Sequence, residues 1–189
     1  MAALSVGALL GAGCTAKTPE MDSSIFVATV ADFDGFHDWM NWPAMPASTL
    51  PPIDGGDGVD AGPTGGGDAG SVHPTPLTVY INQPPPHGST SFPVGTVVVK
   101  ETSAGALTSR TIFAMAKRGG DFNPAGAVNW EWFELSNNAD GTVNINWRGV
   151  EPSGSMDPYA SNPNVCNECH LKAAANDDVW SSALQLSNF

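Results

Sequence analysis

The residues with the clearest chemical potential form one pentapeptide near the C-terminus, Cys166-Asn167-Glu168-Cys169-His170. This C-x-x-C-H spacing is the attachment pattern of c-type haem. Two cysteines three residues apart lie on the same side of one helical turn, where both can add to the vinyl groups of a single porphyrin. The adjacent histidine can then bind the iron as an axial ligand. The spacing therefore predicts covalently attached haem c, with His170 as the metal ligand.

The same cysteine pair has three other uses: a simple disulfide, a redox-active C-x-x-C, or half of a zinc site. A structural zinc site needs four ligands, and His37, His73 and His87 offer no second pair at the usual spacing. A thioredoxin-like pair requires a βαβ setting, which the late position of the motif and the antiparallel strands expected before it do not provide. The spacing favours haem over these uses, and colourless protein after maturation would indicate a disulfide.

Composition narrows the class of partner. The chain has 189 residues, a formal net charge of -12 and only seven Lys and Arg residues. So few cations cannot neutralise the phosphates of a nucleic acid, and we expect no nucleic-acid partner. The length suits one domain. An acidic chain is not attracted to anionic lipid by charge, so contact with a membrane requires an anchor.

The N-terminus offers such an anchor. Residues 1–14 form a short apolar stretch that ends in small residues directly before Cys14. This resembles the signal of a bacterial lipoprotein, with Cys14 as the lipidated residue; a plain secretory signal and an ordinary N-terminal apolar segment are the alternatives. The first two predict export to the periplasm or cell envelope. We divide the chain into a leader and tether (1–23), a single haem domain (24–186) and a tail (187–189).

Two segments precede the expected sheet. Apolar residues recur at three-to-four spacing over residues 24–42, which predicts an amphipathic helix ended by Pro43. Residues 46–72 are rich in Gly, Asp and Pro and contain almost no large apolar side chain. Such a stretch cannot bury enough surface to offset its ordering entropy, so we expect a disordered insertion there.

Period-two alternation then predicts five strands, with a tight turn at Asp140-Gly141 that makes a hairpin of the last two. The alternation places Val128, Trp130 and Trp132 on one face. The chain is expected to become helical again after residue 161, with a second short helical run over 177–186. The fold class is α+β: a mainly antiparallel β-sheet with an N-terminal helix and a C-terminal helical haem-attachment segment. The predicted strands are 77–82, 95–101, 110–117, 128–135 and 142–147.

Several segments occur together in an order that resembles one family of haem proteins. They are an aromatic N-terminal helix ending near Trp39, T-V-Y-I (78–81), F-P-V-G-T-V-V-V-K-E (92–101), N-W-E-W-F (129–133) and the terminal C-x-x-C-H. The chain thereby resembles the cytochrome P-460 and cytochrome c′-beta family over residues 26–186, apart from the insertion. The G-T-V-x-V-K-E strand is the discriminating part, because many unrelated cytochromes share C-x-x-C-H.

The resemblance implies a five-coordinate haem c and a distal pocket for nitrogen species. Cytochromes P-460 oxidise hydroxylamine and carry a lysine cross-link to the porphyrin, and Lys100 stands at the position of that lysine. A lysine at a strand end otherwise extends into water. The enzymes also use a distal carboxylate on the strand after the lysine strand, where ungapped matching places Phe113. A phenylalanine wall offers no base, so it suits an uncharged gas such as nitric oxide or carbon monoxide.

We therefore expect an exported mono-haem cytochrome of this type, acting as a gas binder or as an oxidoreductase on hydroxylamine or nitric oxide. Its expected partners are the small ligand and a redox protein, and related proteins are often homodimers. The alternative is an electron-transfer cytochrome in which a second strong axial ligand closes the iron site. The candidates for that ligand are Met40, Met115, Met156, His37 and His87.

Overall fold

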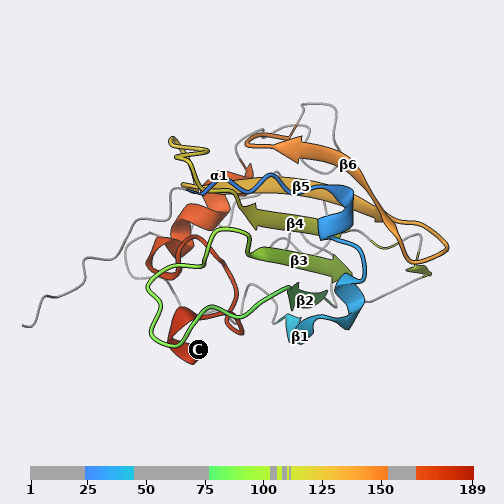
Figure 1. Ribbon diagram of the computed structural model, residues 1–189, viewed down its shortest axis with the longest axis horizontal. Helices are drawn as coiled ribbons and strands as arrows, with labels where there is room; N and C mark the ends of the chain where they lie inside the picture. The colour runs from blue at the N-terminus through green and yellow to red at the C-terminus, as the bar shows by residue number, and fades with distance from the viewer. Residues whose placement is uncertain (1–23, 45–76, 103–105, 108–109, 111, 153–164) are drawn as a thin grey trace, which may run out of the picture.

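The computed structural model of the chain describes residues 24–44, 77–102, 106–107, 110, 112–152 and 165–189. Within these residues six strands form one antiparallel sheet, and their spatial order follows the order of the chain (Figure 1). The sheet consists of β1 (Met40–Ala44), β2 (Leu77–Ile81), β3 (Val97–Thr102), β4 (Ile112–Lys117), β5 (Trp130–Asn137) and β6 (Val143–Gly149).

The five predicted strands are confirmed as β2 to β6, with ends that shift by one or two residues. The predicted hairpin between β5 and β6 is confirmed as well. Its turn is closed by Asn138 N donating to Thr142 O at 2.8 Å and by Gly141 N donating to Asn138 O at 3.1 Å. Gly141 has a φ of 86°, a left-handed conformation that glycine adopts at no steric cost.

The predicted N-terminal helix is wrong. Residues 24–44 instead form two 3-10 turns, η1 (Val30–Asp32) and η2 (Phe36–Asp38), followed by strand β1. Phe33 directly follows η1 and Phe36 begins η2, and both side chains are fully buried. Left-handed Gly35 separates the two turns. Pro43 does not end a helix but lies in β1, an edge strand, where a missing N–H is tolerated.

The C-terminal segment begins with the helix that was expected around the C-x-x-C-H motif, α1 (Val165–His170). The 3-10 helix η5 (Leu171–Asn176) continues it, and a short η6 (Leu186–Asn188) lies near the end of the chain. The second helical run predicted over 177–186 is wrong, because Asp177 and Asp178 are both left-handed and break the helix.

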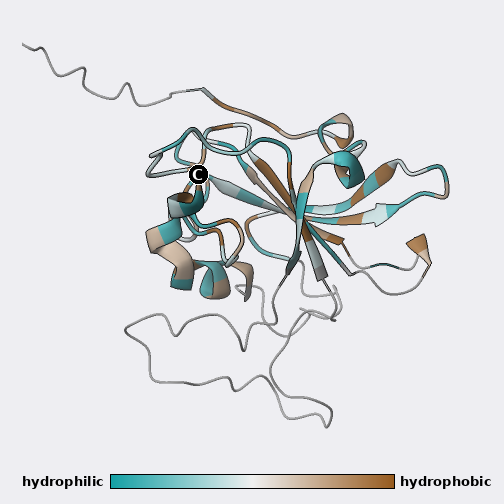
Figure 2. Cartoon of the chain, turned by 90° about the horizontal axis from the view of Figure 1, so that it is seen from below, coloured by the Kyte–Doolittle hydropathy of each residue, from teal (hydrophilic) through white to brown (hydrophobic). Residues whose placement is uncertain are grey.

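Alternate side chains of each strand point to opposite faces of the sheet, and a different segment covers each face (Figures 1 and 2). We call these the N-terminal face and the C-terminal face, after the segment that covers each. Ala28, Phe33 and Phe36 pack in the cluster on the N-terminal face. Val179 and Leu184 pack in the cluster on the C-terminal face.

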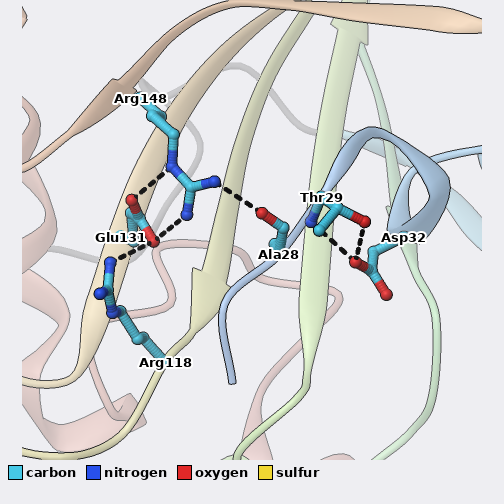
Figure 3. A network of polar contacts seen from close by, with 6 residues as sticks. All are labelled: Ala28, Thr29, Asp32, Arg118, Glu131 and Arg148. Atoms are coloured by element: carbon cyan, nitrogen blue, oxygen red, sulfur yellow. Dashed lines mark hydrogen bonds and ion pairs between the residues drawn. The ribbon is translucent and has the colours of Figure 1, made fainter. Parts of the chain in front are cut away.

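A buried carboxylate fastens the N-terminal segment to its face (Figure 3). Glu131, which is 3% exposed, accepts two hydrogen bonds of 2.7 Å from Arg148 and one of 3.1 Å from Arg118. Arg148 also donates to Ala28 O at 2.7 Å. Asp32 accepts from the N–H and the hydroxyl of Thr29 and caps the first turn. The hydrogen bonds of Arg148 therefore join β5 and β6 to the segment before β1.

Some expectations lie outside the described residues: the leader with Cys14, the insertion at 46–72 and the ligand candidate Met156. Among the helices that the structure does describe, none has the length and apolar character needed to cross a membrane.

Candidate haem-attachment site

Helix α1 carries both cysteines of the motif on a single turn, as the attachment chemistry requires. Cys166 and Cys169 are half-buried free thiols, and Cys166 packs against the apolar cluster on the C-terminal face. Burial raises the pKa of the Cys166 thiol to about 12 and also raises the pKa of Cys169. Thiols with raised pKa values hold little thiolate near neutral pH, so the free pair is poorly suited to thiol–disulfide exchange.

Asn167, between the two cysteines, fastens α1 to the sheet. Its Oδ1 accepts from Asn123 Nδ2 at 2.8 Å, from Trp132 Nε1 at 3.1 Å and from Ala127 N at 3.2 Å. Its Nδ2 donates to Val150 O at 3.2 Å. Sequence reasoning treated Asn167 only as a spacer, and a buried polar residue at that position had no sequence signal. The chain itself thus holds the turn that presents the two thiols.

His170 is oriented by a backbone carbonyl. Its Nδ1 lies 2.7 Å from Asp178 O, and because a carbonyl only accepts, Nδ1 carries the proton and Nε2 carries the lone pair. The ring also packs on Trp132, with 4.5 Å between the ring centroids. Burial, followed by the charge of Lys100, lowers the pKa of His170 to about 4. A neutral imidazole with one nitrogen fixed by hydrogen bonding is the form in which histidine binds a metal.

Strand register brings three polar and aromatic candidates into one row on the C-terminal face. Lys100 pairs with Phe113, and Phe113 pairs with Glu134 on the next strand. Directly paired residues of antiparallel strands point to the same side, so these three side chains are neighbours. All three are half-buried. The full row, from β1 to β6, is Trp42, Val79, Lys100, Phe113, Glu134 and Trp147.

Lys100 lies within electrostatic range of the attachment motif. Burial lowers the pKa of Lys100 to about 8, and the charges of Cys169 and Cys166 oppose that shift. A lysine amine with a lowered pKa is also a better nucleophile at neutral pH than one in water.

Glu134 is the functional candidate that sequence reasoning missed. Its Oε2 is buried without a hydrogen-bond partner, and its Oε1 accepts only a 3.5 Å contact from Asn146 Nδ2 among the bonds seen in the described part of the chain. An unpaired buried carboxylate oxygen is costly, so it marks a place where a ligand group or water completes the site. The signal was present in the alternation of β5, because Trp130, Trp132 and Glu134 share a face.

The remaining candidates are divided between the two faces of the sheet. Glu101 and Glu131 both point to the N-terminal face, where Glu101 accepts from His37 Nε2 at 3.1 Å. His37 is therefore engaged on the face opposite the motif. Met115 lies on the C-terminal face, 4% exposed and paired with Trp132. Val128, expected on the same face as the tryptophans, precedes β5 and is 42% exposed.

The donor set fits a covalently bound porphyrin. Two thiols on one helical turn suit two vinyl groups, and the Nε2 lone pair of His170 suits iron. Beside them, the half-buried aromatic side chains of Trp42, Phe113 and Trp147 offer the apolar surface that a flat macrocycle buries. Within the described ranges, no group of three or more His, Cys, Asp and Glu side chains is arranged to hold a metal ion by itself.

Comparison with known proteins adds no relative: no family model matches the chain, and no curated protein or solved structure is significantly similar to it. The residues of the site therefore carry the functional argument alone.

Proposed function

We propose that this chain is an exported mono-haem c-type cytochrome of the P-460 and c′-beta type, which binds and transforms small nitrogen species such as nitric oxide and hydroxylamine. The observation that carries the proposal is the single turn of α1 that bears both thiols, followed by a His170 ring whose Nδ1 is held by Asp178 O. The row of Lys100, Phe113 and Glu134 supplies the surface beside that turn.

Each residue has a separate role in this proposal. Cys166 and Cys169 form the two thioether bonds, and His170 binds the iron through Nε2. The haem supplies a redox-active iron with an open coordination position for a small ligand. Lys100 would form the additional bond to the porphyrin, and Phe113 would form an apolar wall that excludes water from the ligand.

Glu134 favours transformation of the ligand over simple binding. Oxidation of hydroxylamine releases protons, which need an acceptor within reach of the substrate. The unpaired Oε2 of Glu134, next to Phe113, is such an acceptor. The electrons released go to a redox partner protein. Phe113 alone, with no proton acceptor beside it, would support binding of an uncharged gas but not oxidation of hydroxylamine.

The first experiment is an absorption spectrum of the chain after expression in a host that exports it and has working c-haem maturation. We expect a red protein that is high-spin when reduced, and a spectrum that changes on adding nitric oxide. Colourless protein would refute the proposal. A low-spin spectrum in both oxidation states would refute the open site and select the electron-transfer alternative, for which Met40 and Met115 are described ligand candidates on the C-terminal face.

The second experiment tests the lysine bond. Silver ions cleave the thioether bonds of haem c, so only an additional bond keeps the haem on the treated chain. We expect intact mass to show retained haem in the wild type and complete release in Lys100→Arg, which preserves the charge. Release from both proteins would remove the cross-link from the proposal and leave haem attachment intact.

A third experiment addresses export. We propose a lipid anchor at Cys14, supported only by the apolar stretch before it. Labelled fatty acid should be incorporated into the wild type and not into Cys14→Ser. Labelling of neither protein, with export preserved, would select the plain secretory signal.

A further inference from the structure

The carbonyl that fixes His170 belongs to a turn with an uncommon backbone conformation. Asp177 and Asp178 are consecutive left-handed residues, with φ of 53° and 63°. Asp178 N donates to Ala173 O at 3.0 Å, which ties the turn back to η5. Aspartate adopts this conformation more readily than most residues other than glycine, but as single residues rather than in succession. The position of Asp178 O therefore depends on what holds this turn.

Asp177 is held from three directions by the sheet and its loops. Its Oδ1 accepts from Lys117 Nζ at 2.6 Å, and its Oδ2 accepts from Phe92 N at 2.8 Å. Its carbonyl accepts from Trp130 Nε1 at 2.8 Å. The Lys117 and Asp177 side chains are only 7% and 15% exposed, so water screens their attraction little.

Lys117 is fixed just as firmly on its own side. It ends β4 on the C-terminal face, where it pairs with Trp130. Its Nζ lies 4.9 Å from the centroid of the Trp130 ring and 3.4 Å from Val128 O, to which it donates. A short ion pair whose two members are both immobilised can transmit the position of the sheet to the turn.

We infer that Lys117, acting through Asp177, is a positioning residue for His170. The ion pair fixes the turn, the turn fixes Asp178 O, and Asp178 O holds the imidazole with its proton on Nδ1. Nε2 is thereby kept as the lone-pair nitrogen, and the hydrogen bond at Nδ1 makes it a stronger donor to a metal. The consequence at the iron rests on the proposed function; the orientation of the imidazole does not.

The first test uses the full chain without haem, labelled with ¹⁵N at histidine and studied by NMR at pH 8. We expect His170 of the wild type to carry its proton on Nδ1 and to exchange it slowly. Lys117→Met and Asp177→Asn should move the proton toward Nε2 and speed its exchange at least tenfold. Asp177→Asn has the same shape and keeps the carbonyl that accepts from Trp130, so it serves as the variant least prone to unfolding.

The matched control is Arg118→Met, which removes the neighbouring cation. Arg118 pairs with Glu131 on the N-terminal face, and Arg148 continues to satisfy that carboxylate. We expect the His170 signals of this variant to match the wild type. Unchanged tautomer and exchange in folded Lys117→Met and Asp177→Asn would overturn the inference and leave the ion pair a purely stabilising contact. An equal change in Arg118→Met would overturn it too.

The second test uses the matured protein. Weakening the bond to Nδ1 should lower the iron–histidine stretching frequency in resonance Raman spectra and raise the reduction potential in both variants, while Arg118→Met changes neither. If the NMR signals shift as expected but the matured chain holds no haem, the proposed function fails and the positioning role stands. If haem is present and these two readouts do not move, the role of Lys117 at the iron is refuted while the proposed function stands.

Discussion

Truncation of Asn167 to alanine tests whether the chain itself holds the attachment turn. The substitution removes one acceptor that serves three donors, on Asn123, Ala127 and Trp132. A buried donor left without a partner costs about 1–3 kcal/mol. Asn123 Nδ2 keeps two other acceptors, Ala127 O at 3.2 Å and Trp130 O at 3.3 Å. The other two donors are deeply buried, and we expect Asn167→Ala to lower the free energy of unfolding by about 2–4 kcal/mol.

The assay is urea unfolding of the haem-free chain, followed by tryptophan fluorescence. Asn144→Ala is the matched control, because Asn144 is exposed and its amide donates only to Asn138 Oδ1 among the described bonds. We expect that variant to lie within about 0.5 kcal/mol of the wild type. Asn167→Asp should be at least as unstable as Asn167→Ala, because it places a carboxylate oxygen against Val150 O and Asn123 Oδ1, to which the asparagine amide donates.

The result that refutes this reasoning is an Asn167→Ala protein as stable as the Asn144→Ala protein. It would mean that water or local relaxation satisfies all three donors, and that Asn167 does not fasten α1. A stability loss without any loss of covalent haem after maturation would separate the two roles: the anchor would stabilise the domain without being needed to present the thiols.

Four further outcomes follow from single sites. In Gly126→Ala the new methyl would clash with the Asn167 carboxamide, and calorimetry should show a loss of about 1–3 kcal/mol in the free energy of unfolding, against none if the amide moves freely. Glu131→Gln leaves Arg118 and Arg148 facing a neutral amide, and urea unfolding should show a loss of about 3 kcal/mol in the free energy of unfolding. This is near the low end for a broken buried ion pair, because the two arginine side chains are 28% and 32% exposed. Glu134→Gln should slow hydroxylamine oxidation by about 10²-fold or more with nitric oxide binding unchanged, and a parallel loss of binding would indicate a damaged pocket instead. In the haem-free chain the pKa of His170 is lowered to about 4, so on acidification the unfolded state binds a proton at this residue before the folded state does. The free energy of unfolding should therefore be highest above about pH 6.5 and fall toward pH 4. His170→Gln should reduce this dependence on pH between about 4 and 6.5.

The sheet could be predicted from the sequence because its alternation reflects a simple fact: each strand has one side on the N-terminal segment and the other on the C-terminal segment. The helix predicted over 24–42 failed for a reason that the sequence pattern conceals. Apolar residues three positions apart can come from two separate 3-10 turns as well as from one helix. The packing of Phe33 and Phe36 on the sheet decides between these two structures.

The site was predictable in part. C-x-x-C-H is local in the sequence, so its residues were found without a fold, and the resemblance placed Lys100 near them. Placing Glu134 beside Lys100 and Phe113 requires the register of three strands, which the sequence does not give. The alternation that puts Trp130 and Trp132 on one face does extend to Glu134, two residues later. Asp177 was interpreted as part of a helical first turn because its partner, Lys117, is distant in the sequence.

The contacts of the attachment turn bear on what haem adds to the fold. The hydrogen bonds of Asn167 and His170, and the packing of Cys166 on the apolar cluster, are all made by the chain alone. In the proposed haem protein, α1 should therefore form before haem is attached. The row of side chains on the C-terminal face is different, because Trp42, Phe113 and Trp147 are only half-buried. Stabilisation by the proposed haem should accordingly come from covering part of this row, through burial of apolar surface, and not from folding α1.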